Sequence, residues 1–348
     1  MISSLMMALA VSCEKGIDPI NAVTPGADTS APVINISYPL EGTLVRVPET
    51  VASIVILCSA SDDIELKKVV LQMDGADIAS FDSFKDYRRA ALSYTYDNVT
   101  DGDHVLTVVA TDLSGKTSTS SVNFKKVAPY NPLPGEVFYM PFDGDNNDLV
   151  SMVAAKKVGS PTFGPGKTGQ AYQGATDAYL TFPATALTNP EFSATFWYKL
   201  NGTPDRAGIL AICRPYAVYN DTTRFKGLRV ARENNGAKQN LFVNFGISAA
   251  EVWMNPFITV TPSDTWMHIA ITISATKATI YVDGAVVKEA PMDHAIDWSG
   301  CTSMSLMSGK PNFDYWNHFS DLSMMDELRI FNKALSAEEV TSIYQMKK

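Results

Sequence analysis

The segment from Asn312 to His318, Asn-Phe-Asp-Tyr-Trp-Asn-His, is the densest gathering of aromatic and hydrogen-bonding residues in the chain. An exposed indole or phenol ring can lie against the C–H face of a sugar ring, while neighbouring amides and carboxylates bind the sugar hydroxyls. The segment stands in the expected loop before the last strand. We therefore predict that Asn312, Asp314, Tyr315 and Trp316 bind carbohydrate.

Other loops carry the same residue types. Loops at one edge of a β-sandwich can converge on a shared site. The predicted binding residues in these loops are Arg214, Tyr216, Tyr219, Trp253 and Trp298. The alternative for each ring is that it covers an end of the sandwich. Three further rings fall in expected strands, where packing is the simpler interpretation: Trp197, Trp266 and His268.

Composition limits the possible partners. The chain has 348 residues, of which 46% are hydrophobic and 19% charged, which indicates a globular protein of two domains. A net charge of -9 argues against nucleic acid and anionic lipid as main partners. No apolar run reaches membrane-spanning length, so we expect membrane contact only through a lipid anchor.

The N-terminus suggests such an anchor. Residues 1–12 are apolar and small, and Leu9-Ala10-Val11-Ser12-Cys13 resembles a bacterial lipobox, which implies cleavage before Cys13 and its acylation. Several acyl chains together hold a protein stably on a membrane. We expect a signal segment at 1–13, export through the Sec pathway, a flexible tether at 14–31 and an outer-membrane, cell-surface location. The alternative is a disordered N-terminus with a chance cysteine.

Residues 32–128 show the pattern of an all-β domain. Short alternating segments are separated by turns such as Asp74-Gly75, a strong hairpin sequence. About seven strands in a hundred residues suggest an immunoglobulin-like sandwich. The run from Asp101 to Gly115 resembles bacterial Ig-like modules, and we interpret His104 within it as a core or edge residue rather than a ligand. Three prolines in residues 129–135 indicate a stiff linker.

The C-terminal segment predicts a last strand followed by a docking helix. Leu328 and Ile330 alternate with charged neighbours, and Ser336 and Glu339 have the spacing of a capping box. The run Asp326–Asn332 resembles the C-terminal motif of LamG-like jelly rolls, in the concanavalin A-like lectin/glucanase superfamily. Two upstream segments resemble the same family, Phe138–Gly144 and Trp266–Gly284. The resemblance implies that residues 136–348 form a jelly roll, so the whole chain is expected to be all-β.

The resemblance also implies a calcium ion. Asp143, Asp148 and Asp326 match positions that help to hold a structural Ca²⁺ in similar jelly rolls, where carboxylates and backbone carbonyls suit a hard cation. The alternative is that Asp143 and Asp148 form turns and Asp326 caps a strand end.

Catalysis is not the favoured interpretation. Relatives of the glucanase branch carry acidic residues alternating along one strand, because retaining hydrolysis needs paired carboxyl groups about 5 Å apart. Asp326 and Glu327 are adjacent and point to opposite faces of their strand. No serine nucleophile elbow, zinc-type histidine pair or phosphate loop is present. Cys213 and Cys301 could form a disulfide, and we expect two free thiols.

The combination resembles the cell-surface glycan-binding lipoproteins encoded beside polysaccharide-utilisation machinery in Bacteroidetes-type bacteria. It implies capture of an oligosaccharide or polysaccharide without catalysis, with outer-membrane glycan-uptake proteins as partners. Two alternatives stay open. One is a protein-binding adhesion module, and the other is a glycoside hydrolase with an unrecognised acidic pair.

Overall fold

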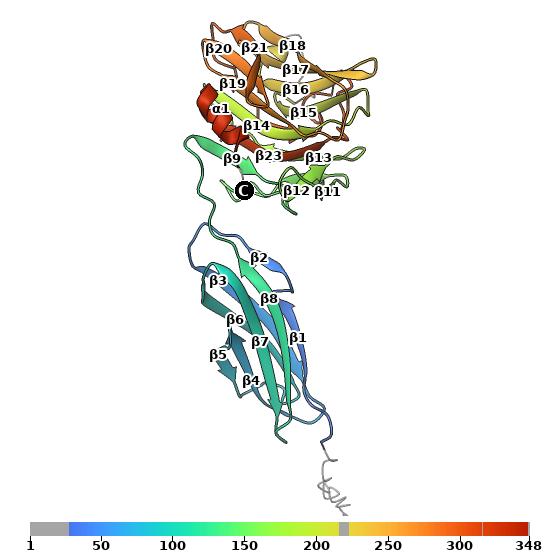
Figure 1. Cartoon of the computed structure of the whole chain (residues 1–348). Coiled ribbons are helices and arrows are strands. Elements are labelled where there is room, and N and C mark those ends of the chain that lie inside the picture. Colours follow the sequence, from blue (N-terminus) through green and yellow to red (C-terminus); the bar gives the residue numbers. More distant parts are fainter. Residues whose placement is uncertain (1–27, 216–222, 315, 347–348) are drawn as a thin grey trace, which may run out of the picture. The chain divides into compact units, whose positions relative to one another are not determined.

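The computed structural model describes residues 28–215, 223–314 and 316–346. The chain divides into two compact units, Met1–Ala128 and Pro129–Lys348 (Figure 1). Both units are built from two mainly antiparallel sheets with a buried apolar layer between them. The predicted all-β class is confirmed.

The first unit is an immunoglobulin-like sandwich. Its smaller sheet has the order β1-β3-β6, with bounds Val33–Tyr38, Ala52–Ser61 and Arg89–Val99. Its larger sheet has the order β2-β8-β7-β4-β5, with bounds Thr43–Val45, Thr117–Lys126, Gly102–Asp112, Leu66–Met73 and Ala76–Phe81. Among the neighbouring strand pairs of these two sheets, only β2–β8 is parallel.

Along β3 and β7 every second side chain points inward, and these side chains form the core of this unit. Ile54 and Ile56 on β3 meet Leu106 and Val108 on β7, because every second side chain of a strand points to the same face. His104 takes the same face and is 7% exposed. Its Nδ1 lies 2.7 Å from an Asp74 carboxylate oxygen and its Nε2 lies 2.7 Å from the Thr100 carbonyl. The interpretation of His104 as a satisfied core residue is therefore confirmed.

The second unit packs two larger sheets face to face. The seven-stranded sheet has the order β10-β13-β22-β15-β16-β17-β18, with bounds Lys156–Val158, Tyr179–Pro183, Ser303–Leu306, Arg206–Ile212, Leu228–Asn235, Lys238–Gly246 and Glu251–Val260. The eight-stranded sheet has the order β11-β12-β23-β14-β19-β20-β21, with bounds Thr162–Pro165, Gln170–Gln173, Met324–Phe331, Phe192–Lys199, Met267–Ile273, Lys277–Val282 and Ala285–Pro291. The eighth strand, β9 (Glu136–Met140), pairs with β23.

A large apolar core lies between these sheets. Phe196 from β14, Ile271 from β19 and Leu328 from β23 meet Val230 and Val243 from the opposite sheet, and all five are fully buried. Branched and aromatic residues of this kind suit a pleated, buried surface. The core fixes both sheets, so the side chains that alternate with it must lie on the two outer faces.

Helix α1 (Ala337–Tyr344) covers part of the outer face of the eight-stranded sheet (Figure 1). Ser336 and Glu339 form the predicted capping box, in which each side chain accepts a hydrogen bond from the other residue's backbone N–H. Val340 and Ile343 pack on Ala270 and Phe331. No helix in the described part of the chain is long and apolar enough to cross a membrane.

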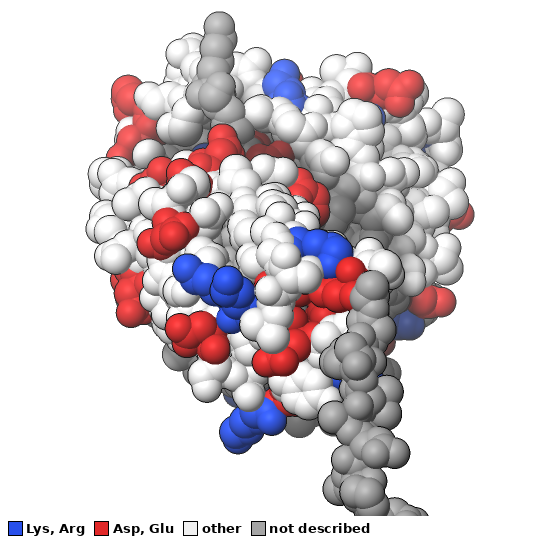
Figure 2. Space-filling model, turned by 90° about the horizontal axis from the view of Figure 1, so that it is seen from below, with Lys and Arg blue, Asp and Glu red and all other residues white. Residues whose placement is uncertain are grey.

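Charges of both signs are mixed on the surface. On the face in Figure 2, lysine and arginine side chains are interspersed with aspartate and glutamate among the coloured residues, and acidic groups are prominent. Cys58, Cys213 and Cys301 are buried free thiols, as expected for the latter two. Cys13 lies outside the described residues.

Candidate functional site

The outer face of the seven-stranded sheet carries a second, smaller apolar cluster. Because Val230 and Val243 point into the core, Ala231 and Phe242 point outward from the same two strands. The loop between β22 and β23 folds across this face and inserts Phe313, which is fully buried against them. The loop is thereby held on the sheet.

Two tryptophans stack on this face. The ring centroids of Trp253 and Trp316 lie 5.6 Å apart with an interplanar angle of 28°. Trp253 rests on Phe242, with ring centroids 5.6 Å apart, and Trp316 meets the edge of Phe313 at the same distance. Trp253 keeps 39% of its surface exposed. A supported, part-exposed indole of this kind can receive an apolar ring face from solution.

Two arginine–glutamate pairs border the tryptophans. The Arg224 guanidinium lies 5.6 Å from the Trp316 ring centroid and 3.5 Å from Glu251. Arg206 donates a hydrogen bond from Nη1 to the Trp316 carbonyl, at 3.4 Å, and lies 3.6 Å from Glu233. We call Trp253, Trp316 and these four charged residues the aromatic face. Its charges balance, and they provide both donors and acceptors of hydrogen bonds.

An open groove of about 690 Å³ extends the aromatic face at Arg206. Pro204, Asp205, Asn317 and Phe319 form the rest of its lining. Phe319 is 39% exposed, so the groove has an aromatic surface of its own. Volumes of about 300–1,000 Å³ are usual for small-ligand sites.

Comparison with known families fits this architecture. Residues 174–341 match the family model described as the concanavalin A-like lectin/glucanases superfamily. The second unit contains a concanavalin A-like domain. Residues 32–108 match the model of a bacterial Ig domain, so both predicted resemblances are confirmed. No curated protein matches the chain.

Several solved structures resemble the chain. One is domain 4 of AbnA, a GH43 extracellular arabinanase from Geobacillus stearothermophilus, in complex with arabinotriose, with 17% identity, a TM-score of 0.47 and coverage of 60% of this chain and 98% of that one. Another is the binding domain of Paraclostridial Mosquitocidal Protein 1, with 11% identity, a TM-score of 0.44 and coverage of 60% and 52%. A third is the receptor binding domain of botulinum neurotoxin type G, with 15% identity, a TM-score of 0.42 and coverage of 61% and 51%. The chain thus spans about half the length of these two toxin domains.

The concanavalin A-like domain brings together only some of the predicted carbohydrate-binding residues. Trp253 and Trp316 meet, although Trp253 belongs to β18 rather than to a loop. Asp314 is half-buried in the same segment as Trp316, and its buried Oδ1 has no hydrogen-bond partner among the residues that the structure describes. Tyr216, Tyr219 and Tyr315 lie outside the described residues.

Three predicted residues have structural roles instead. Asn312 is fully buried, and its amide donates to the Ser303 carbonyl at 3.0 Å, so it is not accessible to a surface ligand. Trp298 donates from Nε1 to the Asn189 carbonyl at 2.7 Å and packs beside the core, and Arg214 donates to the Ser299 carbonyl at 2.8 Å. For Asn312 the prediction of ligand binding is wrong, because the side chain is fully buried. For the half-buried Trp298 and Arg214, ligand binding stays a prediction.

Sequence reasoning missed Arg206, Arg224 and Phe319. Phe319 directly follows the Asn312–His318 segment, and extending that segment by one residue would have included it. The two arginines lie far from the segment in sequence. Nothing in their local sequence indicates that the fold brings them to Trp316.

His318 is buried beneath the aromatic face, where its ring packs against Phe313 and Trp316. It is fully buried, its ring stacks on Phe313 with centroids 4.7 Å apart, and Nε2 lies 3.2 Å from Glu233. Burial lowers the pKa of His318 to about 3, with further lowering from Arg206 and Arg232. A neutral imidazole therefore occupies this position at physiological pH.

The three aspartates predicted to bind calcium do not share one environment. Asp148 is 2% exposed, and its Oδ1 accepts from the backbone N–H of Tyr139 at 2.9 Å and of Val150 at 3.0 Å, as a turn-forming residue does. Asp143 instead accepts from the N–H group of Gln170, the first residue of β12, and Asp326 accepts from that of Thr168, in the turn just before this strand. Within the described residues, no group of three or more His, Cys, Asp or Glu side chains is arranged to hold a metal. Calcium at Asp143 and Asp326 stays a prediction.

Proposed function

We propose that this protein captures a neutral oligosaccharide or polysaccharide through the aromatic face, without catalysis. The observation that carries the proposal is the Trp253–Trp316 stack, because its outer indole is supported from below and 39% exposed. A sugar C–H face stacked on Trp253 would place ring hydroxyls toward the neighbouring charged groups.

The charges around the stack favour an uncharged sugar. Arg224 lies beside Glu251 and Arg206 lies beside Glu233, so each cation already has an anion within 4 Å. Guanidinium groups offer planar pairs of donors and carboxylates offer paired acceptors, which suits adjacent hydroxyl groups. The adjoining groove at Phe319 has room for a further sugar unit.

We also propose that the protein is an outer-membrane lipoprotein acylated at Cys13. Residues 14–31 would then be a tether that gives the binding domain reach at the cell surface. Outer-membrane glycan-uptake proteins would receive the captured sugar. A structural calcium ion held by Asp143 and Asp326 belongs to the same proposal.

A glycan microarray of bacterial, plant and animal oligosaccharides, with hits measured by isothermal titration calorimetry, tests the proposed activity. We expect saturable binding of a neutral glycan and no release of reducing ends. The variant W253A should lose binding. Y87A is the matched control, because Tyr87 is an exposed aromatic residue, at 54%, in the first domain. Absence of any glycan hit would favour protein adhesion, and released reducing ends would show hydrolysis.

A further inference from the structure

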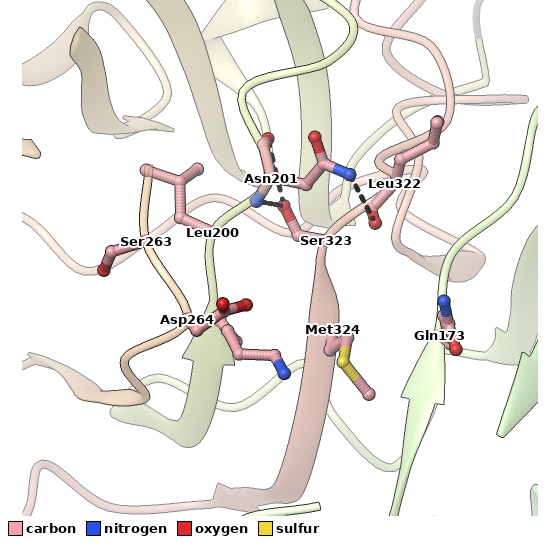
Figure 3. A pocket seen from close by; sticks show the side chains of 9 residues that line it. Gln173, Leu200, Asn201, Ser263, Asp264, Leu322, Ser323 and Met324 are labelled. Atoms are coloured by element: carbon pink, nitrogen blue, oxygen red, sulfur yellow. Dashed lines mark hydrogen bonds between the residues drawn. The ribbon is translucent and has the colours of Figure 1, made fainter. Parts of the chain in front are cut away.

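A second pocket, of about 390 Å³, lies where β14 ends and β23 begins. Its lining combines ammonium, carboxylate, amide and hydroxyl groups with three apolar side chains. The lining residues are Gln173, Lys199, Leu200, Asn201, Ser263, Asp264, Leu322, Ser323 and Met324. Figure 3 shows Asp264 and Gln173 on opposite sides, with Met324 between them. None of these residues belongs to the aromatic face.

Hydrogen bonds hold one wall of this pocket in place. The Ser323 hydroxyl accepts from the Asn201 backbone N–H at 2.8 Å (Figure 3) and lies 2.9 Å from the oxygen of Tyr198, whose own proton goes to Asp321. The Asn201 side chain donates to the Leu322 carbonyl at 3.4 Å. Tyr198 and Asp321 are fully buried behind this wall. The fold therefore fixes this wall of the pocket, while exposed side chains, Gln173 and Asp264 among them, line its rim.

The pocket has two charged side chains, Lys199 and Asp264. Among the described residues, neither Lys199 nor Asp264 is in an ion pair, whereas the arginines of the aromatic face both are. The Lys199 ammonium lies 5.5 Å from the Trp266 ring centroid, a cation–π contact that leaves its hydrogen-bond donors available. Trp266 directly precedes β19 and is half-buried, so it is not the strand residue expected from sequence.

We propose that this pocket binds a hexuronic acid residue of an acidic glycan. Lys199 pairs with the sugar carboxylate, and the Asp264 carboxylate accepts hydrogen bonds from adjacent hydroxyls. Gln173 supplies an amide, and Met324 and Leu200 contact the C–H groups of the ring. The volume suits one or two sugar units.

The same residues disfavour a phosphorylated ligand. A phosphate dianion needs several donors or cations, and the pocket has one lysine with a carboxylate in the same lining. A carboxylate carries one negative charge and needs only one cation. The hydroxyl groups of the sugar ring then donate hydrogen bonds to the Asp264 carboxylate. A ligand with only anionic groups would be repelled by this carboxylate.

Calorimetry with trigalacturonate, and with galactotriose as the uncharged comparison, tests this site. We expect trigalacturonate to bind and galactotriose to bind at least tenfold more weakly. The variant K199M should lose at least tenfold in affinity for trigalacturonate, and D264N should also weaken it. Higher salt should weaken binding to the parent protein, because the interaction is charge-assisted.

Two controls separate this site from the aromatic face. K157M removes an exposed lysine of β10 in the same domain and should bind trigalacturonate as the parent does. W253A should also bind it normally, even though it loses the neutral glycan. Absence of trigalacturonate binding, unchanged binding in both K199M and D264N, or equal binding of galactotriose and trigalacturonate by W253A, in which the aromatic face is disabled, would overturn the proposal. None of these results would bear on the aromatic face.

Discussion

Trp253 and Trp316 stack 5.6 Å apart on the outer face of the seven-stranded sheet, and Trp253 is 39% exposed whereas Trp316 is half-buried. The two substitutions should therefore differ. W253A should weaken glycan binding at least tenfold and should lower the free energy of unfolding by less than W316A does, because Trp253 is the more exposed ring. W316A should weaken binding and also destabilise the domain, because Trp316 covers Phe313. Calorimetry and urea unfolding measure both effects, and unchanged binding in W253A would remove the aromatic face from consideration.

A buried ion pair beside the core should control stability. Arg232 and Asp321 are both fully buried, with Nη2 and Oδ1 2.9 Å apart. The Tyr198 hydroxyl also donates to Asp321. D321N should cost about 3–5 kcal/mol, because it leaves the guanidinium charge uncompensated in the interior. Urea unfolding measures this loss. D177N is the control, since Asp177 is 80% exposed; a loss below about 1 kcal/mol in D321N would contradict the argument.

Stability should fall in weak acid because of His268. It is 1% exposed on β19, and burial, assisted by Arg329, lowers its pKa to about 4. Between pH 6.5 and 4 the unfolded chain binds a proton here that the folded chain does not, so stability decreases as pH falls. The contribution is about 1.4 kcal/mol per pH unit.

The variant H268Q isolates this effect. Unfolding free energies of parent and variant, measured from pH 7 to 4.5, should converge by about 2–3 kcal/mol. H294Q is the control, since the His294 side chain is 69% exposed, and its curve should parallel that of the parent. A constant difference between parent and H268Q would show that His268 does not supply the pH dependence.

Calcium should stabilise the second domain if Asp143 and Asp326 hold the ion. A chelator should then lower the melting temperature of the protein, because a ligand that binds only the folded state stabilises it. D143N should have the lower melting temperature already and respond little to the chelator. Differential scanning calorimetry measures both. Identical curves with and without chelator in the parent protein would exclude a structural ion.

Acylation of Cys13 should place the protein in the membrane fraction. Expressed with its N-terminus in a bacterium that processes lipoproteins, the parent should incorporate labelled palmitate and partition into detergent. C13A should do neither, because the thiol that receives the lipid is gone. C58A provides the control, since Cys58 is buried in the first domain. Labelling that persists in C13A would refute the anchor.

The sequence alone determined that the chain forms two β-sandwiches. It also determined which face of several strands points into the core. The faces of β7 and β23 follow from alternation, which is a local property, and the capping box at Ser336 depends on residues three apart. Residue type also indicated Trp253 and Trp316 as candidate carbohydrate-binding residues. The sequence could not show that Asn312 is buried, because the burial of a loop residue depends on the strands that the loop crosses.

Only the tertiary structure decided which of these side chains meet. Trp253 reaches Trp316 because the β22–β23 loop folds over β17 and β18, and Lys199 and Met324 share a pocket because β14 and β23 are neighbours in the sheet. Arg232 and Asp321 likewise meet from distant parts of the chain. Strand order and loop path arise from long-range packing of the whole core, which alternation within single strands does not specify.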